Sequence, residues 1–284
     1  MLYYIKKLKR GKRDMKKTTR TLFNRVASLA LAAVMVLSVL CVSVPTEVSA
    51  AAKSFKSTGK SSVTITDQEC TSLTGQLTWI KFKAKNNGYL KITAKNASSV
   101  VSYTQGNWQL YDKNKKKAVS PAHSYNTNQT DSYYYTDVYG VKKGATYYLA
   151  VESYAGVKIN AAFTKVTDKS GSKKSKALTI KKNKESVGLI RVGDSKVDDW
   201  YKLNLSSVKK FTVYLTPYAN DDLVLTISGS KLDRTYKYTI KSGYYGKKLD
   251  FPFKTNYGTI SGTIYVKVEP ATKNGSGFYK LKWK

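Results

Sequence analysis

Two adjacent carboxylates, Asp198 and Asp199, stand directly before a tryptophan in the stretch KVDDWYKLNL, residues 196–205. Such carboxylates serve as the acid and base of a hydrolase, as oxygen ligands of calcium, or as caps of the turn that leads into a β-strand. A hydrolytic pair needs a second carboxylate across a cleft, roughly 5–10 Å away, and a raised pKa. Neighbours at a strand entrance point in different directions, and the net charge of +32 is expected to lower their pKa values. The pattern therefore favours a strand entrance over calcium, and calcium over catalysis.

Calcium is the second interpretation because hard oxygen ligands at neighbouring loop ends suit that ion. Five aspartates would converge if their loops lie at one end of a domain. The alternative is that each one caps a turn and pairs with a lysine. No other cofactor is predicted. The candidate calcium ligands are Asp194, Asp198, Asp199, Asp221 and Asp222.

No other catalytic arrangement is recognisable in the sequence. The single histidine, His123, excludes a site built from several histidines, and its neighbours in SPAHSYN predict a solvated loop. There is no G-x-S-x-G elbow, no H-E-x-x-H and no phosphate loop. Cys70 has no basic neighbour in DQECTS that would lower the pKa of its thiol. We therefore predict that the protein is not an enzyme; an enzyme with an unrecognised site is the remaining alternative.

Two tryptophans are predicted to face outward from β-strands. Side chains alternate across a strand, so the apolar trio that begins at Tyr201 in WYKLNL faces the core, and Trp200 and Lys202 face the other way. Trp79 and Lys81 stand in the matching places of LTWIKFKA. A flat aromatic ring flanked by hydrogen-bonding side chains can hold a sugar ring. The alternatives are that each tryptophan covers its sheet against a neighbouring segment or fills a gap in the core.

Tyrosine-rich segments supply further candidates for ligand contact. Tyr134 and Tyr135 lie in SYYYTDVYG, and Tyr244 and Tyr245 lie in GYYGKK. This composition is typical of adaptable recognition loops. It is equally typical of strands with cross-strand aromatic pairs. Both interpretations remain open.

Residues 1–50 have the composition of an export signal. A basic leader precedes the apolar run VASLALAAVMVLSVLCVSV, and the following PTEVSA has small residues at Val48 and Ala50. Cleavage is predicted near Ala50; a membrane anchor is the alternative, because the run approaches the length of a spanning helix. Cleavage would leave 40 basic and 16 acidic residues, a net charge of +24. It would also leave one cysteine, so stability must come from packing and not from an internal disulfide.

The remaining chain is patterned for β-strands. Short segments rich in Val, Ile, Tyr, Thr and Phe alternate with polar residues and are separated by Gly, Asn, Asp and Ser. The lysine-rich segment KVTDKSGSKKSK, residues 165–176, interrupts the series and indicates a linker or exposed crossing. The predicted domains are residues 53–166 and 177–284, joined by a linker at 167–176.

Three pairs of similar segments occur in the same order in the two halves, which indicates a duplicated domain of about 110 residues. Each half is long enough for a β-sandwich of roughly seven to nine strands. The pairs are LTWIKFKA (77–84) with DDWYKLNL (198–205), GYLKITA (88–94) with KFTVYLT (210–216), and GATYYLAVE (144–152) with GTIYVKVE (262–269).

The second half resembles the bacterial pre-peptidase C-terminal domain in ALTI, VGLIRVGD, VDDWYKLNL, FTVYL, GTIYVKVEP and GSGFYKLKW, over residues 176–284. The first half is similar only through TGQLTWIKFKA, WQLYDKNKK and GATYYLAVE, and it lacks the double aspartate. The resemblance implies a jelly-roll-like β-sandwich of the kind carried by secreted proteases and other exported proteins, some of which bind calcium at their loops. The predicted fold class is therefore all-β: two tandem jelly-roll-like antiparallel β-sandwich domains after a signal peptide.

The charge predicts attraction to polyanions. Only two arginines, Arg191 and Arg234, follow residue 50, and specific nucleic-acid recognition favours arginine, so no specific nucleic-acid partner is predicted. No segment after residue 50 is apolar enough to span a bilayer. We predict a secreted, non-catalytic protein, held at a cell surface by charge if at all. Its expected partner is an extracellular glycan or an anionic polymer; the alternative is an accessory or adhesion module that engages secreted proteases, host matrix or receptors.

Overall fold

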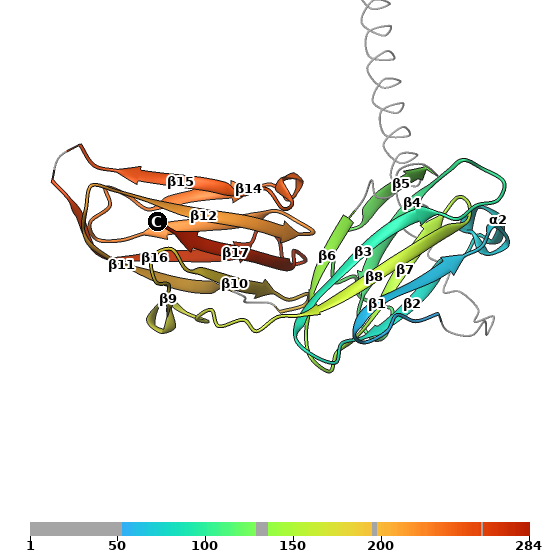
Figure 1. Cartoon of the computed structure of the whole chain (residues 1–284). Helices are drawn as coiled ribbons and strands as arrows, with labels where there is room; N and C mark the ends of the chain where they lie inside the picture. The colour runs from blue at the N-terminus through green and yellow to red at the C-terminus, as the bar shows by residue number, and fades with distance from the viewer. Residues whose placement is uncertain (1–52, 129–135, 195–197, 257) are drawn as a thin grey trace, which may run out of the picture. The chain divides into compact units, whose positions relative to one another are not determined.

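The computed structural model describes residues 53–128, 136–194, 198–256 and 258–284. Residues 51–284 form one compact unit. This unit consists largely of antiparallel β-strands (Figure 1), which confirms the predicted all-β class. No helix within the described residues is long and apolar enough to cross a membrane. The predicted signal peptide lies outside the described residues.

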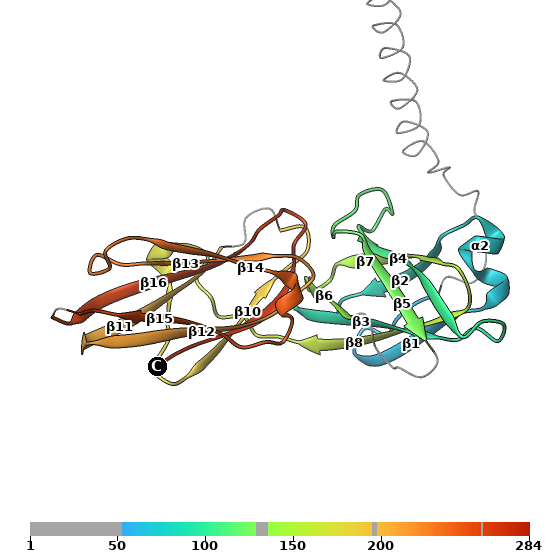
Figure 2. The ribbon, with the colours of Figure 1, turned by 90° about the horizontal axis from the view of Figure 1, so that it is seen from above.

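The first eight strands form two four-stranded sheets, with strand orders β1-β8-β3-β6 and β2-β7-β4-β5. Figure 2 shows the two sheets as layers. We call this pair the first sandwich. Its strands are β1 (Gly59–Ile65), β2 (Thr78–Lys83), β3 (Gly88–Asn96), β4 (Tyr103–Tyr111), β5 (His123–Asn128), β6 (Thr136–Val141), β7 (Thr146–Ser153) and β8 (Val157–Lys165). The short turns η1 (Asp67–Glu69) and α2 (Thr71–Thr74) join β1 to β2.

The second sandwich has the sheets β10-β17-β12-β15 and β14-β13-β16-β11-β9. All of its strand pairs are antiparallel except the short pair of β9 with β11. Its strands are β9 (Leu178–Thr179), β10 (Glu185–Ile190), β11 (Asp199–Val208), β12 (Lys210–Ala219), β13 (Leu223–Ser228), β14 (Tyr236–Ile240), β15 (Leu249–Lys254), β16 (Ile260–Pro270) and β17 (Gly277–Trp283). The short helical turns are η2 (Lys174–Lys176) and η3 (Ser242–Tyr244).

The two sandwiches repeat one strand order. The sheet β2-β7-β4-β5 corresponds to β11-β16-β13-β14, and β1-β8-β3-β6 corresponds to β10-β17-β12-β15. The three similar sequence pairs fall on β2 and β11, β3 and β12, and β7 and β16, which hold the same places in these orders. The two sandwiches also share a short parallel pairing at the edge of one sheet. Ser54 forms a parallel bridge with Lys81 of β2, and β9 pairs in parallel with β11.

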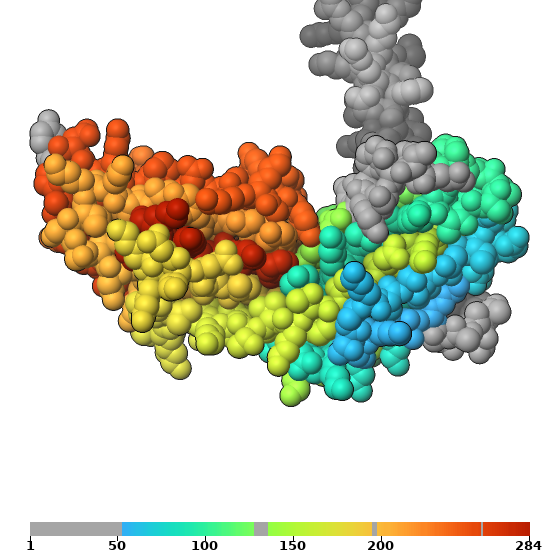
Figure 3. Space-filling view, viewed as in Figure 1, coloured from blue at the N-terminus to red at the C-terminus, as the bar shows by residue number. Residues whose placement is uncertain are grey.

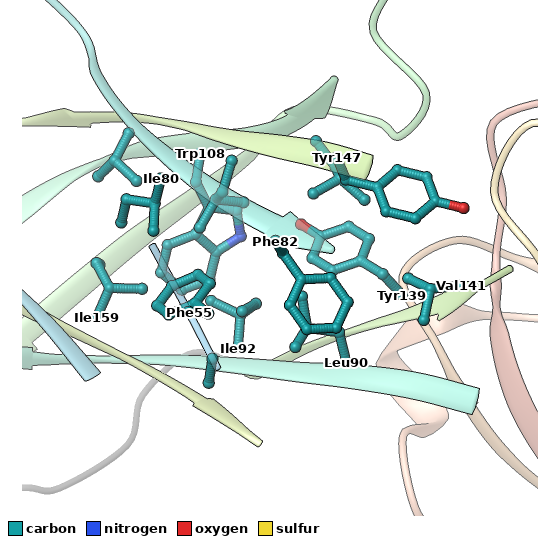
Figure 4. Close-up of a cluster of buried hydrophobic side chains, with 14 of the residues drawn as sticks. Phe55, Ile80, Phe82, Leu90, Ile92, Trp108, Tyr139, Val141, Tyr147 and Ile159 are labelled. Atoms are coloured by element: carbon teal, nitrogen blue, oxygen red, sulfur yellow. The ribbon is translucent and has the colours of Figure 1, made fainter. Parts of the chain in front are cut away.

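Strand alternation builds the core of the first sandwich. In β2, Ile80 and Phe82 are buried while Lys81 between them is exposed. These side chains meet Ile92 and Trp108 between the two sheets (Figure 4). Full burial of an apolar side chain of this size stabilises the fold by about 1.5–3 kcal/mol. Because the single cysteine after residue 50 is free, packing of this kind holds the sandwich together.

The second core follows the predicted alternation. Trp200 and Lys202 of β11 are only half-buried, and Lys280 and Lys282 of β17 lie on the outward side. The inward side chains of these two strands are buried: they are Tyr201, Leu203, Leu205, Tyr279, Leu281 and Trp283.

The segment predicted as an exposed crossing, residues 165–176, is partly built into the fold. Asp168 accepts a hydrogen bond from the backbone N–H of Ser170 at 2.8 Å. Gly171 is buried, and it exchanges two backbone hydrogen bonds with Trp200, at 3.0 and 2.8 Å. Residues 172–176 are exposed. The prediction of an exposed crossing is therefore wrong at Gly171, because the backbone there adds to the edge of a sheet.

Candidate functional site

The outward face of the sheet β2-β7-β4-β5 carries aromatic and polar side chains in adjacent cross-strand rows. One row joins Trp79 of β2, Ala150 of β7 and Gln109 of β4. The next row joins Lys81, Tyr148 and Tyr111 on the same three strands. Directly opposite residues have Cβ atoms about 4.5–5.5 Å apart, so these side chains form one continuous surface. We call this surface the aromatic face; it comprises Trp79, Lys81, Gln109, Tyr111 and Tyr148.

Trp79 is the centre of the aromatic face. Its ring meets the ring of Tyr111 edge-on, with centroids 5.2 Å apart and planes at 76°. The ammonium group of Lys115 lies 5.4 Å from the ring centroid of Trp79 and 5.0 Å from that of Tyr148. Lys115 comes from the turn that follows β4, where its φ is 57°. Aromatic rings and a cation therefore converge at one place.

The indole N–H of Trp79 is an unused donor. Its Nε1 atom is buried and has no hydrogen-bond partner within the described residues. A buried donor without an acceptor costs about 1–3 kcal/mol. The surrounding residues cover this atom, so what the Trp79 ring can offer a ligand is the partly exposed flat surface of the indole.

A polar row borders the aromatic rings. The side-chain amide of Asn107 donates to Glu152 at 2.8 Å, and the hydroxyl of Ser124 donates to Asn107 at 2.7 Å. The hydroxyl of Tyr111 donates to the side-chain oxygen of Gln109 at 3.1 Å. These bonds fix the direction of amide and carboxylate groups on an outward sheet surface. Oriented polar groups beside aromatic rings are the usual make-up of a ligand site.

Trp200 takes the corresponding place in the second sandwich, but its surroundings are charged. Lys267 lies directly opposite it in register, with its ammonium group 5.8 Å from the indole centroid. The same ammonium group pairs with Glu269 at 2.8 Å and lies 4.0 Å from Asp198. Lys202 faces Tyr265 across the same two strands. Both tryptophans lie on outward faces, as predicted. Each has a tyrosine in the next cross-strand row, but the ring of Trp79 also meets Tyr111 edge-on, whereas Lys267 lies over the ring of Trp200.

The tyrosines predicted as ligand contacts differ in their surroundings. Tyr244 is 42% exposed, and Lys247 places its ammonium group 5.9 Å from the ring centroid. Tyr245 instead packs edge-on against Tyr218, with centroids 5.2 Å apart, and burial raises its pKa to about 12. Tyr245 therefore contributes to the fold more than to the surface. The other pair, Tyr134 and Tyr135, lies outside the described residues.

Asp199 is buried and has a raised pKa, whereas the sequence predicted a lowered one. Its carboxylate is buried and accepts hydrogen bonds from the hydroxyls of Tyr279 at 2.6 Å and Ser170 at 2.7 Å. Burial, with a smaller contribution from the charge of Asp168, raises the pKa of Asp199 to about 7. The predicted lowering by the basic chain is wrong here, because loss of hydration outweighs distant charges that water screens.

A cavity of about 670 Å³ opens beside Asp199, and its walls include Asp168, Asp194, Asp198 and Arg191. An acid with a pKa near neutrality is suited to proton transfer. Both oxygens of Asp199, however, already accept hydrogen bonds from side chains of the fold. We therefore assign Asp199 a structural role, in which it ties the segment at Ser170 to the core.

The predicted calcium ligands do not form a cluster. Within the described residues there is no group of three or more His, Cys, Asp or Glu side chains that could hold a metal. The other four aspartates have separate partners: Asp194 with Arg191 (2.7 Å), Asp198 with Lys267 (4.0 Å), Asp222 with Lys241 (2.8 Å), and Asp221 with the hydroxyl of Thr272 (2.5 Å). Calcium binding at Asp194, Asp198, Asp199, Asp221 or Asp222 remains an untested prediction.

His123 is not the solvated loop residue that was predicted. It begins β5, and its Nδ1 lies 3.3 Å from Asp137, a buried carboxylate in the first core. The indole of Trp108 and the hydroxyl of Tyr139 also donate to Asp137. Burial raises the pKa of Asp137, and the nearby His123 opposes that rise. The prediction failed because the acid that draws His123 inward comes from β6, at some distance along the chain.

No protein-family model matches this chain, and no curated protein matches it. Similar solved structures include the pre-peptidase C-terminal domain of a collagenase from Bacillus anthracis, at 16% identity over 43% of this chain and 100% of that one, with a TM-score of 0.29. A CBM22-1–CBM22-2 tandem from Paenibacillus barcinonensis is 10% identical over 72% of this chain and 82% of that one, with a TM-score of 0.22. Similarity at this level assigns neither a family nor a function.

Proposed function

We propose that this protein is a non-catalytic binding module that holds an extracellular glycan on its aromatic face. One observation carries the proposal: Trp79, Tyr111 and Tyr148 gather on the outward side of one sheet, beside the bonded pair of Asn107 and Glu152. Aromatic rings pack against the C–H groups of a sugar ring, and oriented amides and carboxylates bind its hydroxyls. Stacking supplies most of the affinity in this scheme, and the polar row supplies orientation.

Lys115 covers the rings on which a sugar would stack. Its ammonium group lies over both Trp79 and Tyr148, so a ring that stacks there must move it aside. The cation–π contact that is lost is worth about 0.5–1 kcal/mol at an exposed site. The displaced ammonium group stays beside the ligand and can pair with an acidic substituent.

The proposal is tested by a glycan array read at low and at high salt with the intact protein and two variants. We expect binding that persists at high salt, because stacking is little affected by ionic screening, and that Trp79→Ala weakens by about tenfold or more. Trp200→Ala is the matched control, since it removes an outward indole at the corresponding place of the second sandwich. Equal losses in both variants, or complete loss of binding with added salt, would contradict the assignment to the aromatic face.

A second candidate function, contact with another protein, is favoured by exposed apolar side chains at one end of the first sandwich. Leu73 is 72% exposed and Val100 is 74% exposed. The loops that carry such residues are held in place, because Asp67 accepts hydrogen bonds from the backbone of Ser99 and Gly156 at 3.0 and 2.7 Å. Fixed loops with exposed apolar tips are typical of protein interfaces.

Pull-downs from culture supernatant test this second candidate. The bait is the intact chain, and the comparison is a Leu73→Ser, Val100→Ser double variant. A partner that is kept in competing sugar and lost with the double variant supports protein contact. If the intact chain and the double variant recover the same proteins, contact through Leu73 and Val100 is rejected.

A further inference from the structure

A second surface, on the other sheet of the second sandwich, concentrates positive charge. Six lysines lie on or beside the outward face of the sheet β10-β17-β12-β15, which is turned toward the viewer in Figure 3, with β17 in dark red between β12 and β10. Two carboxylates, Glu185 and Asp250, accompany them. We call this surface the lysine face; its lysines are Lys210, Lys248, Lys254, Lys280, Lys282 and Lys284.

Like charges stand directly opposite one another on the lysine face. Lys210 of β12 pairs in register with Lys254 of β15, and both side chains are exposed. Like charges in this position destabilise an antiparallel pair. Lys284 extends the crowding, because its backbone exchanges hydrogen bonds with Thr212, two residues along β12 from Lys210. An anion bound among these ammonium groups would remove the repulsion.

Tyr214 gathers three of the lysines. Lys282 lies directly opposite it in register. The ammonium groups of Lys248 and Lys284 lie 4.4 and 5.9 Å from the centroid of its ring. Cation–π contact holds these ammonium groups at the sheet surface, where free side chains would spread into water. Positive charge is thus arranged before any ligand arrives, which lowers the entropy lost on binding.

The carboxylates neutralise only part of this charge. Glu185 lies directly opposite Lys282 and pairs with Lys280 at 3.4 Å, and Asp250 lies directly opposite Tyr214, so two carboxylates face six lysines. Lysines two apart on β17 project on the same side, spaced by roughly 7 Å at about 3.3 Å per residue. A linear polymer that carries a charge on each repeat can follow such a row. A single small anion would use only one part of it.

The character of the face favours a polysaccharide over a bilayer or a nucleic acid. The exposed large apolar residues of the described chain are found elsewhere, on the loops near Leu73 and Val100 and at Tyr244, so the lysine face offers none to enter a bilayer. All six of its cations are lysines, whereas planar phosphate recognition and base recognition favour arginine. Lysine is a strongly hydrated point charge on a flexible stem, which can pair with charged groups spaced along a chain without bidentate geometry.

We propose that the lysine face binds a linear acidic polysaccharide, one that carries sulfate or carboxylate groups along its length. This surface uses none of the residues of the aromatic face. It shares only the ligand class with the proposed function, so each surface can fail without the other. The intact protein would hold a glycan by stacking at one surface and an acidic chain by charge at the other.

The test compares two variants that lose the same charge. One replaces Lys248, Lys282 and Lys284 with glutamine; the other replaces Lys60, Lys173 and Lys231, three exposed lysines at separate places. Binding to heparin, hyaluronate, neutral dextran and phosphatidylglycerol vesicles is measured by titration over a range of salt concentrations. Circular dichroism and the melting temperature confirm that both variants are folded. Trp79→Ala is measured alongside.

We expect the first variant to bind heparin or hyaluronate about tenfold more weakly, with a shallower dependence on salt, while the second stays close to the unaltered protein. Dextran should not bind the lysine face. Equal weakening in both triple variants would overturn the proposal, because net charge alone would then explain the binding. Binding to phosphatidylglycerol vesicles without binding to either acidic polysaccharide would also overturn it. Loss of binding in Trp79→Ala alone would place the acidic chain on the aromatic face and reject the lysine face.

Discussion

The two outward sheet faces around Trp79 and Trp200 began from one pattern and now differ in chemistry. Both tryptophans occupy the second position of corresponding strands, β2 and β11. Trp79 meets the edge of Tyr111 and lies in the row next to Tyr148. Trp200 lies under Lys267, which two carboxylates hold in place. Strand order is thus kept where the cores require it, and outward positions are free to take on separate roles.

The buried networks show the same divergence inside. In the first sandwich Asp137 accepts from Trp108 and Tyr139 and lies beside His123. In the second sandwich Asp199 accepts from Tyr279 and Ser170. Among the described residues, each core therefore buries one carboxylate, and a different set of donors satisfies each. A shared fold does not require shared internal chemistry.

The largest expected effect separates the core indoles from the surface indole. Trp108→Ala should lower the free energy of unfolding by about 3–5 kcal/mol, since it empties a large buried site and removes a donor to Asp137. Trp283→Ala, in the second core, should cost a similar amount. Trp79→Ala should cost less than about 1 kcal/mol. Urea unfolding measures all three; a Trp79 variant as unstable as the Trp108 variant would make Trp79 a core residue.

The next effect is the pH dependence that Asp199 adds in the second sandwich, beside that of Asp137 in the first sandwich, whose pKa burial also raises. The pKa of Asp199 is raised from 3.8 to about 7, so in this range the folded state binds the proton more tightly than the unfolded state. Stability should therefore fall as the pH rises from about 4 to 7, by an amount of the order of a few kcal/mol. Asp199→Asn should remove most of this fall. Unfolding measured in urea at pH 5 and pH 8 tests it, with Asp198→Asn as the control for loss of charge at the neighbouring position; an unchanged fall in Asp199→Asn would count against it.

A smaller effect sharpens the contrast between the two faces. Trp79→Ala should weaken glycan binding about tenfold or more, equivalent to about 1.4 kcal/mol, while Trp200→Ala leaves it within about twofold. Lys115→Met keeps the length of the side chain and removes its charge. It should leave binding of a neutral sugar intact and weaken binding of a uronic acid. Isothermal titration with matched neutral and acidic oligosaccharides distinguishes these outcomes.

The smallest effect concerns calcium. We expect the melting temperature to change by less than about 1 °C when excess calcium or a chelator is added, because the described aspartates already have partners in the protein. A calcium-dependent rise of several degrees that Asp194→Asn abolishes would instead establish an ion at the loop before β11.

The sequence correctly predicted which side chains of a single strand point inward and which point outward. It placed Tyr201, Leu203 and Leu205 inside and Trp200 outside, and the three repeated segments fell on corresponding strands. The sequence did not predict which residues on neighbouring strands lie side by side. Tyr148 and Tyr111 join the aromatic face only because β7 lies between β2 and β4, an order that the sequence does not state.

Buried polar groups were the main failure. His123 and Asp199 have polar neighbours in sequence, yet each is drawn inward by groups far away in the chain: Asp137 from β6 and Tyr279 from β17. A local pattern indicates how hydrophilic a segment is. It does not indicate which distant residue will form a hydrogen bond or ion pair with a polar side chain. That partner offsets the cost of burial and so decides whether the side chain lies inside or at the surface.

Gly171 has a consequence for how the chain meets proteases. Both of its backbone groups are bonded to Trp200, and a side chain there would lie 2.1 Å from the carbonyl oxygen of Lys176. A protease needs a stretch of backbone that can leave its neighbours and enter the active-site cleft. The nearby lysines look open to trypsin, but cleavage after Lys169, two residues before Gly171, would first require the backbone at Gly171 to separate from Trp200. Digestion should therefore begin at the exposed lysines beyond it, Lys173 to Lys176, and a bulkier residue at position 171 should make the whole segment a substrate.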